Sequence, residues 1–96
     1  MRKQEVDKLC IYIENSKNII STEAYLEVSN YYEHGEYEMA FEGLLIELID
    51  KNKYPENFKK VEWESLAIEF KLDQESIFDV DIWKKFIGFS EKYTNK

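Results

Sequence analysis

The feature that most constrains the fold of this chain is a helical repeat of apolar residues between positions 37 and 49. Apolar residues there recur at intervals of three and four: Tyr37, Ala40, Phe41, Leu44, Leu45, Leu48 and Ile49. On an α-helix this spacing gathers the side chains on one face, which other parts of the chain must then cover. The sequence therefore predicts a helix over residues 36–51 whose apolar face is buried.

Two segments on the N-terminal side of this helix also carry helical signals. Apolar residues at i, i+3, i+4 and i+7 predict a helix over about residues 3–16. Ser21 suits an N-cap and Glu23 places negative charge in the first turn, which together predict a second helix over about residues 22–33. Gly35 fits the left-handed residue that ends this helix.

Two more helices are expected on the C-terminal side. Pro55 suits the first position of a helix, where its missing N–H costs nothing, and this helix is expected to run to about Phe70. A short helical turn is expected over residues 73–79. Asp79 or Asp81 is then expected to cap the last helix. The apolar residues of that helix are Ile82, Trp83, Phe86, Ile87 and Tyr93.

Length and composition favour one domain. The chain has 96 residues, of which 44% are hydrophobic, and it contains no long flexible linker. Because no segment alternates with a period of two, the expected fold is all-α: a single compact bundle of about five helices joined by short loops, spanning residues 1–96. The single cysteine suits a reducing compartment, and long apolar runs are absent. We expect a cytoplasmic protein without signal peptide or membrane span.

Few residues offer catalytic chemistry. His34 is the only histidine and is expected to hydrogen-bond at a helix end, while Cys10 is expected to be a small core residue. A di-iron Glu-x-x-His pattern is excluded because Tyr31 occupies the required position. We therefore expect no catalytic residue, no cofactor, no metal site and no enzyme activity. A small enzyme with a carboxylate-bound metal is the weakest alternative.

The negative charge of the chain is concentrated in one third of its length. Residues 18–50 contain eight acidic residues and no Lys or Arg, whereas the rest of the chain has twelve acidic and thirteen basic residues. Like charges four residues apart on a helix, such as Glu38 and Glu42, destabilise it by a few tenths of a kcal/mol. Such a surface repels nucleic acid and favours a basic protein partner. The alternative is that the acidic surface only keeps a small protein soluble.

The same stretch resembles a known protein family. The run from His34 to Leu44, H-G-E-Y-E-M-A-F-E-G-L, with Leu48 and Ile49 after it and an aromatic pair before it, is similar to the MafI-type immunity proteins. These belong to bacterial polymorphic-toxin and contact-dependent growth inhibition systems. The resemblance is concentrated in residues 28–50. It implies a helical cytoplasmic protein that binds and neutralises a cognate toxin domain, often a nuclease.

Charge and resemblance lead to one functional expectation. A nuclease must present a basic groove to phosphates, and an acidic helical surface can fill that groove without any chemistry. The core residues of the 36–51 helix are expected to be Tyr37, Phe41, Leu44 and Leu48. The residues expected to bind the partner are Tyr32, Glu33, Glu36, Glu38 and Glu42.

Alternatives remain open at this point. The motif over residues 34–44 is either the contact surface or a signature of the fold. The alternative to an immunity protein is an acidic adaptor or nucleic-acid mimic that binds a cellular nucleic-acid-binding protein. Exposed aromatic residues would also suit the seam of a homodimer.

Overall fold

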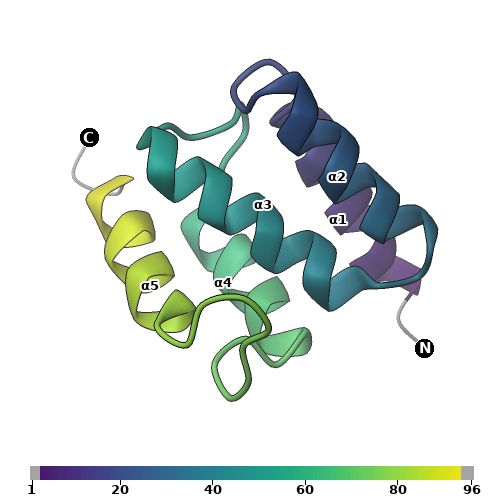
Figure 1. Cartoon of the computed structure of the whole chain (residues 1–96). Helices are drawn as coiled ribbons and strands as arrows, with labels where there is room; N and C mark the ends of the chain where they lie inside the picture. The colour runs from purple at the N-terminus through teal and green to yellow at the C-terminus, as the bar shows by residue number, and fades with distance from the viewer. Residues whose placement is uncertain (1–2, 94–96) are drawn as a thin grey trace.

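Helix α3 (Tyr37–Lys51) runs through the middle of the molecule, and four other helices surround it (Figure 1). The structure is a computed structural model that describes residues 3–93. The other helices are α1 (Lys3–Asn15), α2 (Thr22–Glu33), α4 (Lys60–Glu69) and α5 (Ile82–Tyr93). Helix α2 makes the most extensive contact with α3, while α1 and α5 also pack on it and α4 packs on α5. The expected all-α bundle is confirmed over the described residues.

The apolar face of α3 lies at the centre of the core. Phe41, Leu44 and Leu48 are fully buried, as predicted, and Tyr37 is half-buried against the same core. Aromatic rings extend this core towards α1 and α4. Tyr12 of α1 stacks on Trp63 of α4 with ring centroids 4.1 Å apart, and Phe41 lies 5.9 Å from Trp63. Large rings thus fill the space between three helices.

The predicted signals at the ends of α2 are confirmed. The Ser21 side chain accepts a hydrogen bond of 3.1 Å from the backbone N–H of Ala24, which satisfies one of the free donors of the first turn. At the other end Gly35 has a φ of +77°, the left-handed conformation expected there. The His34 Nδ1 atom lies 2.8 Å from the Asn30 carbonyl oxygen, so His34 hydrogen-bonds at the helix end.

The predicted start of the fourth helix is wrong. Helix α4 begins at Lys60 and not at Pro55. Between them Asn57 has a φ of +64°, which an α-helix cannot accommodate, and the Phe58 N–H donates to the Pro55 carbonyl oxygen over 3.2 Å in a turn. Pro55 therefore belongs to a connection before the helix.

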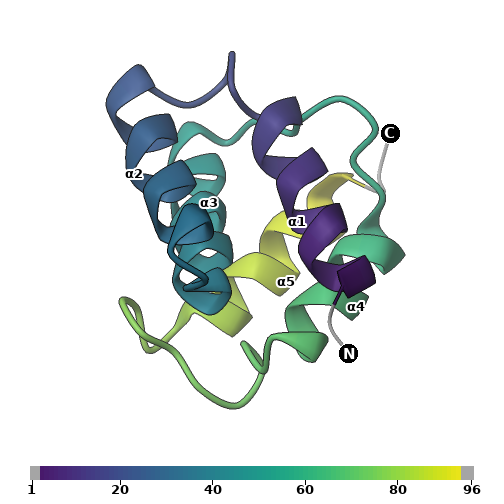
Figure 2. The ribbon, with the colours of Figure 1, turned by 90° about the vertical axis from the view of Figure 1, so that its right-hand side faces the viewer.

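The helical turn predicted over residues 73–79 is also misplaced. The hydrogen-bonded turn lies earlier, where the Lys71 carbonyl oxygen accepts from the N–H groups of Gln74 and Glu75 at 3.0 and 2.9 Å. Lys71 itself has a φ of +64°, which ends the helical path. The segment from Ser76 to Asp81 is not helical, because a side chain of α3 binds three of its N–H groups. This segment crosses α3 on its way to α5 (Figures 1 and 2).

Candidate partner-binding surface

The residues expected to bind a partner fall in three different places. Tyr32 and Glu33, at the end of α2, line a hollow of about 270 Å³ shared with side chains of α1. Glu36 and Glu38, at the start of α3, line a larger hollow of about 660 Å³. Glu42, one turn further along α3, is buried. The structure therefore does not place all five residues on the surface, because Glu42 is buried, and the other four line two different hollows.

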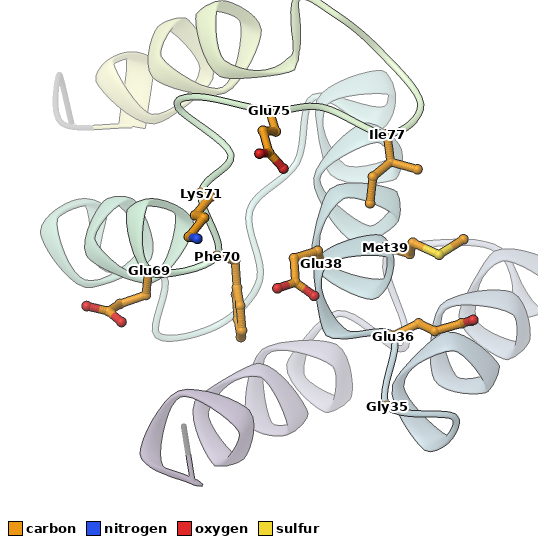
Figure 3. Close-up of a pocket in the computed structure, with 9 residues that line it drawn as sticks. All are labelled: Gly35, Glu36, Glu38, Met39, Glu69, Phe70, Lys71, Glu75 and Ile77. Carbon is orange, nitrogen blue, oxygen red and sulfur yellow. The ribbon is translucent and has the colours of Figure 1, made fainter. Parts of the chain in front are cut away.

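We call the larger space the acidic hollow (Figure 3). Of the described residues that line it, four are glutamates and one is a lysine: Glu36, Glu38, Glu69, Glu75 and Lys71. Two of the glutamates come from the start of α3 and two from the end of α4 and the segment after it. The Glu38 and Glu75 side chains point into the space from opposite sides (Figure 3). Glutamates far apart in the sequence thus line one open volume, although the Glu36 and Glu69 side chains point away from it (Figure 3).

Glu69 and Glu75 were missed because the C-terminal part of the chain is balanced in overall charge. A narrower window carries the signal, since residues 69–81 contain five acidic residues and one lysine. The sequence alone does not show that this segment lies beside the start of α3, which is what brings Glu69 and Glu75 into the same hollow as Glu36 and Glu38. The fold therefore adds two further glutamates, with Lys71 between them, to the two that the first acidic stretch supplies.

Glu42 lies beneath the surface and has no solvent-exposed area (0%). Its Oε1 atom accepts a hydrogen bond of 2.8 Å from the N–H of Ile77. Its Oε2 atom accepts from the N–H groups of Phe78 and Asp79 at 2.8 and 2.9 Å. Burying a carboxylate is costly unless its oxygens are hydrogen-bonded, and bonds to a charged acceptor are among the strong ones.

This position corrects the sequence expectation for Glu42. The residue was expected on the contact surface, but in this structure its carboxylate is occupied by backbone donors and covered by the chain. The spacing of Glu38 and Glu42 suggested two neighbours on one solvated face. Glu42 is buried and Glu38 is not because a segment 35 residues later in the chain covers Glu42. Glu42 therefore supports the surface from below.

The side chain of Tyr32 joins α2 to its neighbours. Its hydroxyl donates to the Val6 carbonyl oxygen over 3.2 Å, and its ring meets the Tyr37 ring edge-on at 5.3 Å. Burial, with a further contribution from the nearby Cys10 thiol, raises the pKa of Tyr32 to about 12. Tyr32 is therefore a neutral, half-buried contact between helices. Its neighbour Tyr31 faces Phe78 instead, with ring centroids 5.9 Å apart.

Three apolar side chains are exposed on the segment that Glu42 holds. Ile77, Phe78 and Val80 are 49%, 47% and 88% exposed, and we call them the apolar ridge. Ile77 lines the acidic hollow. Phe78 lines a further, smaller hollow of about 170 Å³, which we call the second hollow and to which α2 and α3 contribute Glu27 and Glu47. Two adjacent residues of the ridge thus border two hollows with acidic linings.

Within residues 3–93, no group of three or more His, Cys, Asp or Glu side chains is placed to hold a metal ion. Cys10 is half-buried on α1. None of the helices in that range has the length and apolar character that crossing a bilayer requires. What stands out is a surface: an apolar ridge bordered by carboxylates.

Comparison with known proteins adds no relative. The chain matches no family model, no curated protein and no solved structure. The resemblance to MafI-type immunity proteins therefore stays a prediction, and the function must be argued from the surface itself.

Proposed function

We propose that this chain is a cytoplasmic immunity protein that binds a cognate bacterial toxin domain, a nuclease, and neutralises it by covering its basic surface. The protein performs no reaction in this proposal. It binds neither nucleic acid nor a membrane directly and needs no cofactor. Its action is that of a competitor for the site where the nuclease binds phosphates.

The observation that carries this proposal is the acidic hollow. Four glutamates from two distant segments line a space of about 660 Å³, two of them (Glu38 and Glu75) with side chains that point into it (Figure 3), and one lysine is among its described lining residues. Like charges repel one another, so this concentration destabilises the free protein slightly. An oppositely charged surface relieves that repulsion and is drawn to it at long range. A nuclease presents such a surface, because it must bind phosphates.

Exposed apolar side chains beside the charge also support binding to a protein. Ile77 borders the acidic hollow, and Phe78 follows it in the chain. Protein interfaces combine a desolvated apolar centre with a polar rim, and charge complementarity mainly speeds association. The ridge and the hollow together provide both elements.

The test is co-expression with a candidate toxin domain, taken from a reading frame directly upstream of this one where such a frame is found. The wild-type chain should protect cells and bind the purified domain. The double variant Glu36→Lys with Glu75→Lys should weaken binding by roughly tenfold or more and make it less dependent on salt, because two interfacial charges are reversed. Affinity is measured by isothermal titration calorimetry at several salt concentrations.

A matched control separates the hollow from net charge. Glu23→Lys with Glu56→Lys changes the net charge equally, but both residues are exposed and line none of the hollows described above. This control should bind within about twofold of wild type at physiological salt, where distant charges are screened. Absence of protection and of binding by the wild-type chain contradicts the proposal. Specific capture of a cellular nucleic-acid-binding protein instead would favour the acidic adaptor.

A further inference from the structure

The apolar ridge is unusual because it is both exposed and held in place. Large apolar side chains in a free loop tend to fold back onto the protein, since contact with water is unfavourable. Here the backbone N–H groups of Ile77, Phe78 and Asp79 are bound by the buried Glu42 carboxylate at 2.8–2.9 Å. The backbone is therefore fixed while the side chains of Ile77 and Phe78 remain about half exposed.

The surroundings of the ridge specify the charge of what it binds. On one side Ile77 shares the acidic hollow with four glutamates. On the other side Phe78 shares the second hollow with Glu27 and Glu47. The ridge is thus an apolar strip with negative charge on both flanks. A complementary surface has an apolar cleft with positive charge along both edges.

We infer that the apolar ridge is the part of this protein that inserts into its partner, and that it fits an apolar cleft edged by Arg and Lys side chains on another protein. This inference rests on the proposed function and locates its contact. Glu42 acts as a positioning residue: it touches no partner but fixes the conformation of the ridge before binding. Fixing a loop in its bound conformation lowers the entropy lost on association.

The experiment replaces ridge side chains without changing charge. Val80→Asn alters a side chain that is 88% exposed, and the matched control Val61→Asn alters a side chain of α4 that is 74% exposed. Neither change can empty the core, so both variants should fold. Binding to the toxin domain used in the co-expression test should weaken by roughly fivefold for Val80→Asn and stay within about twofold for Val61→Asn.

A double variant, Ile77→Ser with Phe78→Ser, removes the centre of the ridge. Its affinity should fall by roughly thirtyfold or more, because buried apolar anchors dominate interface energetics. Its salt dependence should stay that of wild type, since no charge has changed. Circular dichroism confirms that each variant keeps its helical content.

The outcomes separate the inference from the proposed function. Failure of the wild-type chain to bind the toxin domain overturns both. Wild-type binding that persists in Val80→Asn and in the double variant overturns this inference and leaves the proposed function standing. Equal losses in Val80→Asn and Val61→Asn also overturn it, because the effect would then not belong to the ridge.

Discussion

Helix α2 and the segment over residues 76–81 both rest on α3, but they are held there by different forces. Helix α2 packs by buried side chains such as Ala24 and Val28. The segment is held by hydrogen bonds from its backbone to Glu42. A helix satisfies most of its own backbone groups, so it needs only an apolar face to dock. An irregular segment must find acceptors elsewhere, and one buried carboxylate supplies them.

The comparison also explains why neighbouring acids on α3 differ. Glu38 borders an open hollow, whereas Glu42 lies one turn later beneath the irregular segment. Their chemistry is identical, and only the covering chain distinguishes them. Carboxylates of this helix therefore occupy two environments, one at the surface and one inside the protein.

The largest expected effect comes from removing the acceptor. Glu42→Ala leaves three backbone N–H groups without their carboxylate, and loss of a partner from a buried polar network costs about 3 kcal/mol or more. Urea unfolding should show this loss in the free energy of unfolding. Amide exchange at residues 77–79 should rise most, while the centre of α2 keeps its protection. Unchanged exchange at residues 77–79 would refute the role assigned to Glu42.

A control on the same helix isolates burial from charge. Asp50 is exposed near the end of α3. Asp50→Ala should change stability by less than about 0.5 kcal/mol, as surface substitutions usually do.

A smaller effect of opposite sign is expected where α2 meets α3. An added methyl group at Gly43 would lie 3.5 Å from the Val28 Cγ2 atom, an ordinary contact distance. Gly43→Ala should therefore stabilise the protein by about 1 kcal/mol through helix propensity. Gly88→Ala is the control, because no atom lies within 4 Å of its added methyl group. A loss of thermal stability in Gly43→Ala alone would mean that the contact between α2 and α3 has no room for the added methyl group.

The smallest effect concerns an ion pair at the end of the irregular segment. The Lys85 ammonium group donates to Asp79 over 2.7 Å, and this bond, with the Asp81 N–H, lowers the pKa of the Asp79 carboxyl. A lowered pKa stabilises the fold above the ordinary aspartate value, and this contribution is lost as the pH falls through that range. Lys85 is exposed and Asp79 is half-buried, so solvent still screens and weakens the pair.

The variant Asp79→Asn tests that titration. The difference in unfolding free energy between wild type and variant should shrink as the pH falls from about 5 to about 2. A difference that stays constant over this range would show that the pair contributes nothing. High salt should shrink it as well.

Much of the fold could be predicted from local patterns. The apolar repeat of α3 predicts a helix with one buried face, and Ser21 and Gly35 mark the ends of α2 through chemistry within a few residues. The start of α4 could not be predicted because Asn57 adopts a left-handed conformation that interrupts the helix expected from Pro55, and nothing at Pro55 indicates it. The left-handed Lys71 is still harder to foresee, since lysine has no special preference for it.

The site was less accessible from sequence than the fold. Glu36 and Glu38 line the acidic hollow as surface residues, but Glu69 and Glu75 join them only through tertiary structure. Burial of Glu42 depends on a segment 35 residues away and leaves no periodic signal. Ile77, Phe78 and Val80 carried one overlooked signal: they are apolar residues in a segment that forms no regular element.

The buried carboxylate has a consequence for genetic screens. If the proposed function holds, a library of variants scored only for survival against the toxin would rank position 42 among the most sensitive, beside the positions that contact the toxin. Yet a footprint of the complex would find no intermolecular contact there, because the Glu42 side chain is enclosed by its own chain. Survival scores and footprints should therefore disagree at this residue. That disagreement would identify Glu42 as part of the scaffold.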